Sequence, residues 1–139
     1  MAKLLIADDS TMMRNTLRTI LSESGHTIAA EASNGYEACI GFDKYLPDLL
    51  LLDINMPIMN GVEALQMILS RHPGAKVIIL SGETCSSLIS HMLNMGAKDY
   101  IMKPFSIQRL LDSINKVLQC SQTVSSDALQ CIYRKIDTL

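Results

Sequence analysis

The sequence predicts an α/β domain: a (βα)5 doubly wound, five-stranded parallel sheet with helices on both faces. Three observations predict it. Short apolar runs recur at roughly regular spacing, the segments between them have helical periodicity, and one run is apolar at every position. A chain of 139 residues with 48% hydrophobic residues and a net charge of -2 is long enough for one well-buried domain. We therefore expect a single soluble domain.

Five apolar runs are the expected strands. They are KLLIA at 3–7, TIAAEA at 27–32, DLLLLD at 48–53, KVIIL at 76–80 and the weaker YIM at 100–102. Residues 49–52 are apolar on both strand faces. This pattern favours a central strand covered by helices on each side over a half-exposed antiparallel strand.

The expected helices lie between and after these runs. The apolar positions that indicate them are Met13, Leu17, Ile20 and Leu21 in the first helix and Val62, Leu65, Ile68 and Leu69 in a later one. The last helix of the domain is expected from about 106 to 118, with Ser106 as its cap. Residues 120–127 have linker-like composition, and Asp127 begins one more short amphipathic pattern. We therefore divide the chain into a domain at 1–120 and a linker with a short helical tail at 121–139.

The composition argues against several classes of partner. The chain has no Lys/Arg cluster, so the electrostatic footprint that nucleic-acid binding requires is missing. No uninterrupted apolar run approaches the roughly 20 residues that cross a bilayer, and the first residues do not read as a signal peptide. We expect a cytoplasmic protein that binds neither nucleic acid nor membrane.

Polar residues gather where the expected strands end. The first strand is followed by Asp8 and Asp9, the third ends in Asp53, the fourth is followed by Ser81, and the fifth by Lys103. In an open parallel sheet these carboxyl ends meet at one edge, which is where ligands bind. We therefore expect one site built from these five residues.

The chemistry of this set points to a hard cation and a phosphoryl group. Converging carboxylates repel, so the arrangement makes sense chiefly if Mg²⁺ lies among them. Lys103 supplies a movable charge and Ser81 a hydroxyl donor. Taken singly, Asp9 or Ser10 could be a helix cap and Lys103 a surface lysine. It is their joint occurrence at strand ends that favours the functional interpretation.

Four sequence blocks resemble the receiver domains of two-component response regulators. They are ADDS at 7–10, LLLDINMPIMNG at 50–61, ILSGE at 79–83 and YIMKPF at 100–105. The resemblance covers roughly residues 2–120, and the chain is most similar to stand-alone receivers of the chemotaxis (CheY-like) type. It implies the flavodoxin-like strand order 2-1-3-4-5.

The resemblance also implies roles for the acidic residues. Asp53 would be the phosphoacceptor, taking a phosphoryl group from the phosphohistidine of a sensor histidine kinase. Asp9 would bind Mg²⁺ directly, Asp8 mainly through water, and the carbonyl of Asn55 would complete the ligand set, with Mn²⁺ as a substitute metal. Asn55 and Glu83 lie where the family tunes the lifetime of the phosphoryl group.

Further implied roles concern switching. Lys103 would pair with a phosphoryl oxygen, Ser81 would move to hydrogen-bond another, and Tyr100 would change rotamer with it. The Lys103–Pro104 bond would be cis. The output would be binding of a downstream protein to the face formed by the fourth helix, fifth strand and fifth helix, and a phosphatase is a further candidate partner. The chain would be a switch, not an enzyme with outside substrates, and a monomer or a weak dimer.

Three alternatives remain beside this interpretation. A phosphorelay intermediate, which passes the phosphoryl group to a histidine phosphotransfer protein, would use the same five residues. A flavodoxin-like FMN carrier would need a hydroxyl- and glycine-rich phosphate cradle after the first strand, where this chain has ADDS at 7–10. A metal-dependent phosphatase would need a substrate pocket and a base that the sequence does not indicate.

Overall fold

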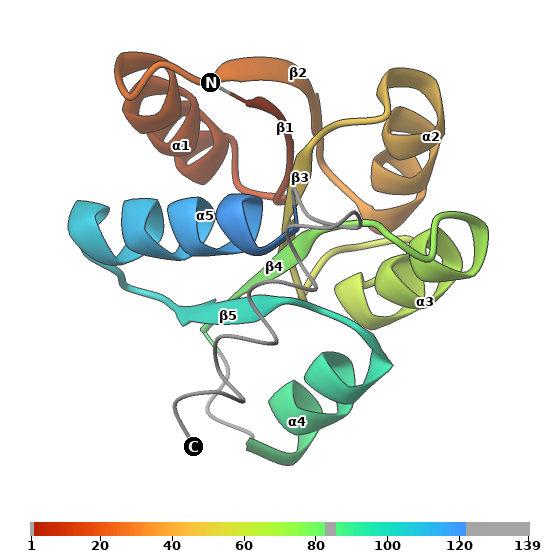
Figure 1. Cartoon of the computed structure of the whole chain (residues 1–139). Coiled ribbons are helices and arrows are strands. Elements are labelled where there is room, and N and C mark those ends of the chain that lie inside the picture. Colours follow the sequence, from red (N-terminus) through yellow and green to blue (C-terminus); the bar gives the residue numbers. More distant parts are fainter. Residues whose placement is uncertain (1, 83–85, 122–139) are drawn as a thin grey trace, which may run out of the picture.

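The structure is a computed structural model that describes residues 2–82 and 86–121 (Figure 1). The strands are β1 (Lys3–Ala7), β2 (Thr27–Ala32), β3 (Leu49–Asp53), β4 (Val77–Ser81) and β5 (Asp99–Met102). The helices are α1 (Thr11–Glu23), α2 (Gly35–Tyr45), α3 (Gly61–Arg71), α4 (Ser86–Met95) and α5 (Ile107–Ser121). Glu83 and the predicted short helix that begins at Asp127 lie outside the described residues.

The strands of the described part form one parallel sheet in the order β2-β1-β3-β4-β5 (Figure 1). β3 lies at the centre, and its five residues are all buried. Both the predicted fold class and the strand order 2-1-3-4-5 are therefore confirmed. Because all strands run the same way, their carboxyl ends meet at one edge.

The helices lie in two layers, α1 and α5 on one face of the sheet and α2, α3 and α4 on the other (Figure 1). The first layer packs around a cluster that includes Leu4, Ile6, Leu17, Leu51, Leu110 and Ile114. The second packs around a cluster that includes Leu5, Phe42, Leu50, Leu52, Leu65 and Ile68. Successive residues of β1 and β3 alternate between the two clusters, as side chains of a strand must. Each such buried side chain contributes about 1.5–3 kcal/mol, so the sheet is a rigid base for the loops at its edge.

Element boundaries differ from the expected ones by a few residues. β3 and β4 each begin one residue later than expected, at Leu49 and Val77, while β5 begins at Asp99. The last helix was expected to end near 118 and continues to Ser121. No glycine or proline lies between 118 and 121 to stop it, so the helical pattern runs on.

Polar caps start α1, α3 and α5, and also α2, directly after the loops at the carboxyl edge. The Ser10 side chain accepts a hydrogen bond from the Met13 amide at 3.2 Å and caps α1. Asn60 and Glu63 form a reciprocal capping box on α3. Ser106 accepts from the Arg109 amide at 3.0 Å at the start of α5. These caps fix where the loops end and the helices begin.

None of the helices in residues 2–82 and 86–121 is long and apolar enough to cross a membrane.

Candidate functional site

The predicted acidic residues come together at the carboxyl edge of the sheet. Asp8 and Asp9 follow β1, and Asp53 is the last residue of β3, the strand beside it. One carboxylate oxygen from each of the three lies within 4.8 Å of the others. Asp8 is fully buried and Asp53 is 6% exposed, whereas Asp9 is exposed. The set is therefore open to solvent on the side of Asp9.

This donor set fits a hard divalent cation. All three side chains offer carboxylate oxygens, and none offers the nitrogen or sulfur that softer metals prefer. Three carboxylates this close repel one another unless a positive charge separates them. Asn55 lies in the same loop system, two residues after Asp53, with an exposed side chain.

Lys103 brings a positive charge into the acidic cluster from the end of β5. Its Nζ lies 2.7 Å from Asp8 Oδ2 and 3.5 Å from Asp53 Oδ1. Burial raises the pKa of Asp53; Lys103 offsets part of this rise, and Asp8 and Asp9 add to it. Lys103 therefore offsets only part of the cost of the negative charge on Asp53.

Ser81 and Tyr100 occupy different depths of the neighbouring strands. Ser81 ends β4, is 1% exposed, and its carbonyl accepts from the Lys103 amide at 2.8 Å. Tyr100 lies farther back on β5, where its neighbour on β4 is Ile79. The Lys103–Pro104 peptide bond is cis. The site therefore holds Ser81 directly beside the end of β3, with Tyr100 behind it on the next strand.

Two glycines pack closely against the loop between β3 and α3, namely Gly61 at the start of α3 and Gly35 at the start of α2. The Gly61 amide donates to the Ile54 carbonyl at 2.7 Å, and a Cβ at Gly61 would lie 2.2 Å from the Asp53 carbonyl oxygen. The Gly35 amide donates to the Met59 carbonyl at 2.7 Å, and a Cβ there would lie 2.4 Å from that oxygen. Both glycines are needed for close approach of the backbone. They hold the loop that follows Asp53.

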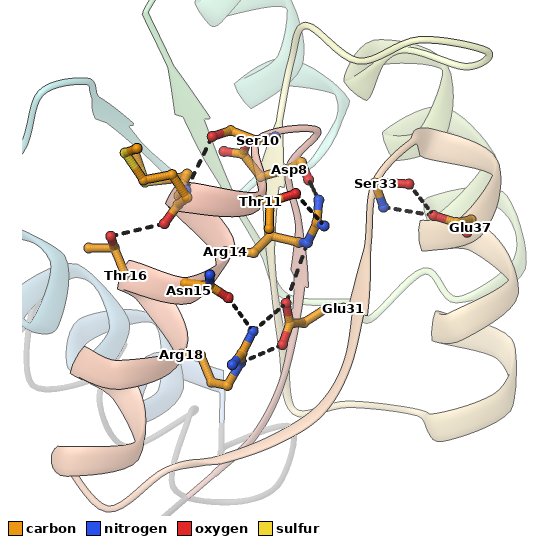
Figure 2. A network of polar contacts seen from close by, with 12 residues as sticks. Asp8, Ser10, Thr11, Arg14, Asn15, Thr16, Arg18, Glu31, Ser33 and Glu37 are labelled. Carbon is orange, nitrogen blue, oxygen red and sulfur yellow. Dashed lines mark hydrogen bonds and ion pairs between the residues drawn. The ribbon is translucent and has the colours of Figure 1, made fainter.

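One residue of this neighbourhood was missed by the sequence analysis. Arg14, on the second turn of α1, donates from Nη1 to the Asp8 carbonyl at 2.5 Å and pairs with Glu31 of β2 (Figure 2). The helical pattern of the sequence places Arg14 on α1. It does not indicate that the side chain reaches the Asp8 carbonyl.

The model of the family described as "Response regulator receiver domain" matches residues 4–115. The chain is 42% identical over 116 residues to the chemotaxis protein CheY of Listeria monocytogenes, covering 84% of this chain and 98% of that protein.

Solved structures of similar proteins share the fold. The CheX-CheY-BeF3-Mg complex of Borrelia burgdorferi matches with a TM-score of 0.81 and 32% identity, covering 83% of this chain and 87% of that one. A CheY-like receiver domain protein of Methanospirillum hungatei matches with a TM-score of 0.83 and 29% identity, covering 88% and 98% of the two chains.

Proposed function

The chain belongs to the family of response regulator receiver domains, as a CheY-like member, and we propose that it is a phosphorylation-dependent switch in two-component, chemotaxis-type signalling. Asp53 accepts a phosphoryl group from the phosphohistidine of a sensor histidine kinase. The observation that carries this proposal is the position of the buried Asp53 carboxylate, which lies beside the carboxylates of Asp8 and Asp9 and 3.5 Å from the ammonium group of Lys103. The receiver domain is assigned to residues 1–120, in the cytoplasm.

The proposed reaction moves one phosphoryl group between two side chains. An Asp53 carboxylate oxygen attacks phosphorus, the P–N bond to the kinase imidazole breaks, and an acyl phosphate forms. The imidazole nitrogen keeps the electron pair of the broken bond. Such transfers depend on positioning and charge neutralisation, and the buried, rigid edge of the sheet suits both.

The proposed metal ligands are the Asp9, Asp8 and Asp53 carboxylates and the Asn55 carbonyl. Their hard oxygen donors fit Mg²⁺, with Mn²⁺ as a substitute. When bound, Mg²⁺ supplies positive charge to the phosphoryl oxygens. The protein supplies a further positive charge through Lys103, which already contacts Asp8 and Asp53.

Switching follows from contacts that the new dianion creates. Phosphoryl oxygens attract the ammonium group of Lys103 and the hydroxyl of Ser81, which lies at the end of the adjacent strand. Movement of Ser81 changes the packing available to Tyr100 on β5. The output is altered binding of a target protein to the face formed by α4, β5 and α5, with a phosphatase as a further partner. Asn55 and Glu83 tune the lifetime of the phosphoryl group.

Labelling by acetyl phosphate tests the proposal. The parent protein should take up at most one phosphoryl group, only with Mg²⁺ or Mn²⁺, and Asp53→Asn should take up none. Asp43→Asn, which removes a carboxylate paired with Arg71 away from the site, is the matched control and should be labelled normally. Labelling without metal, or of Asp53→Asn, would contradict the proposal. Repeated turnover of a foreign phosphoester would favour a phosphatase instead.

A relay role uses the same chemistry and needs a second experiment. A target of a switch should bind the beryllofluoride-treated protein more tightly than the untreated one. Equal binding of both forms, together with transfer of the label to a histidine phosphotransfer protein, would favour the relay.

A further inference from the structure

We propose that Arg14 is a positioning residue for the chemistry at Asp53. Its guanidinium fixes the main chain of Asp8 and, through it, the turn that carries Asp9. The inference rests on the proposed function, because it assigns Arg14 a part in metal binding and phosphoryl transfer.

Asp8 is held by hydrogen bonds on every side. Its amide donates to the Ala32 carbonyl at 3.0 Å, and its two carboxylate oxygens accept from the Ser10 amide at 2.9 Å and Lys103 Nζ at 2.7 Å. Its carbonyl oxygen accepts from Arg14 Nη1 at 2.5 Å. Arg14 is thus the charged donor on the main chain of Asp8, just before Asp9. Charge-assisted hydrogen bonds are about twice as strong as neutral ones, so this contact restrains the turn.

Arg14 is itself held in place from α1 and β2 (Figure 2). Its Nε lies 3.4 Å from Glu31 Oε1, and its Nη2 donates to Thr11 Oγ1 at 3.4 Å. Glu31 is held in turn by Arg18, whose Nε lies 2.7 Å from Oε2. A planar guanidinium can bond several acceptors in fixed directions, which an ammonium group cannot. The geometry therefore requires arginine and not only a positive charge.

The pairing with Glu31 reduces the repulsion between Arg14 and a metal ion bound nearby. An unpaired arginine here would repel Mg²⁺, but the Arg14 and Glu31 charges largely cancel at a distance. Glu31 also pairs with Arg18, so Arg14→Ala and Arg18→Ala each remove one positive charge from the same group of three residues. Removing Arg14 differs in that it also breaks the hydrogen bond to the Asp8 carbonyl.

Arg14 gains importance once Asp53 is modified. In the proposed switch Lys103 moves from Asp8 toward a phosphoryl oxygen. Asp8 then keeps the bond from the Ser10 amide to its carboxylate and the bond from Arg14 to its carbonyl, and Arg14 is the charged donor that remains on it among the described contacts. Arg14 would keep the Asp8 main chain in place during the step in which the Asp8 side chain loses a partner.

Arg18 provides a matched control. It lies one helical turn after Arg14 on α1 and pairs with the same Glu31, at 2.7 Å, but its described contacts are with Glu31 and Asn15 and not with Asp8. Arg14→Ala and Arg18→Ala therefore both remove an arginine paired with Glu31. Only the first removes a contact with the metal site.

The test compares Arg14→Ala, Arg14→Lys and Arg18→Ala by three measurements: Mg²⁺ affinity by calorimetry, labelling rate at saturating Mg²⁺, and amide hydrogen exchange of Ser10 in the metal-free protein. We expect Arg14→Ala to weaken Mg²⁺ binding or slow labelling by about tenfold, the usual effect of losing a residue that orients a ligand. Its Ser10 amide should exchange faster. Arg14→Lys should behave like Arg14→Ala, and Arg18→Ala like the parent.

Equal results for Arg14→Ala and Arg18→Ala, or recovery by Arg14→Lys, would overturn the inference. Arg14→Lys keeps the positive charge on a side chain that is one atom shorter, so it remains informative if Arg14→Ala does not fold. A parent protein that neither binds Mg²⁺ nor is labelled would contradict the proposed function. The exchange of Ser10 without metal would still test whether Arg14 holds Asp8.

Discussion

The Lys103 ammonium group lies 2.7 Å from Asp8 Oδ2 and 3.5 Å from Asp53 Oδ1. It therefore bridges two strand ends and is closer to the residue that would bind metal through water than to the proposed phosphoacceptor. The side chain of Asp8 is 1% exposed and that of Lys103 is 20% exposed. This buried ion pair makes the charge balance of the site depend on one lysine.

Replacing Lys103 with methionine should destabilise the metal-free protein, and the free energy of unfolding should then increase more on adding Mg²⁺ than it does in the parent. The change leaves the buried Asp8 carboxylate without its ammonium partner, so we expect a loss of about 2–3 kcal/mol in the free energy of unfolding. Since the competing cation is gone, Mg²⁺ should also bind on the order of tenfold more tightly. Urea unfolding with and without Mg²⁺ and calorimetry measure both effects.

Lys116→Met is the control for this prediction. Lys116 also pairs with an aspartate, Asp99, at 3.2 Å, but its side chain is 60% exposed and lies on α5. Its loss should change stability by less than about 1 kcal/mol and leave Mg²⁺ affinity unchanged. Parent-like stability and metal affinity in Lys103→Met would show that the ion pair does not govern the site.

The sequence allowed prediction of those site residues that lie at the ends of strands. Apolar runs define the strands, and the parallel sheet then brings the residues that follow them, such as Asp8 and Asp53, to one edge. Arg14 could not be found in this way. Helical periodicity indicates which face of α1 a residue occupies, but the bond to the Asp8 carbonyl depends on how α1 packs against the sheet and on Glu31, which lies 17 positions farther along.

Replacing Asp53 with asparagine should stabilise the metal-free protein at neutral pH. The pKa of Asp53 is raised in the folded state by burial, so the unfolded chain loses this proton at a lower pH than the folded one does. The charged form therefore lowers stability above the folded pKa, and the effect disappears as the pH falls below the unfolded value. We expect Asp53→Asn to melt roughly 2–5 °C higher at pH 7.

The same comparison at low pH provides the check. Near pH 4 and below, the parent carboxyl becomes neutral, so the two melting temperatures should converge. Saturating Mg²⁺ should also reduce the difference at pH 7, because the metal offsets the repulsion in the parent. A difference that is independent of pH would mean that the charge of Asp53 is not its cause.

His26 should make the protein less stable as the pH falls below about 7. Its Nδ1 accepts a hydrogen bond from the Ala2 amide at 3.2 Å, and burial lowers its pKa. The unfolded chain then binds a proton at a higher pH than the folded one, so stability is lost as the pH falls through the unfolded pKa. Unfolding free energies of the parent and His26→Phe should have pH slopes that differ between pH 7.5 and 5.5. Over this range the free energy of unfolding of the parent should fall by about a few tenths of a kcal/mol more than that of His26→Phe, a small amount because solvent screens this partly exposed group. Parallel slopes would contradict the assignment.

Adding one methyl group at Gly61 should disturb both stability and the site. The new Cβ would lie 2.2 Å from the Asp53 carbonyl oxygen and 2.8 Å from Ile54 Cα, and both are backbone atoms that cannot turn aside. We expect Gly61→Ala to lower the free energy of unfolding by about 1–3 kcal/mol, as other substitutions that overpack a tight position do. Labelling of Asp53 should slow, because the loop that carries Asn55 must shift. At Gly74 a Cβ would meet nothing within 4 Å, so Gly74→Ala should leave labelling and stability close to those of the parent. If the two variants behaved alike, the close approach of Gly61 to the end of β3 would not be what positions this loop.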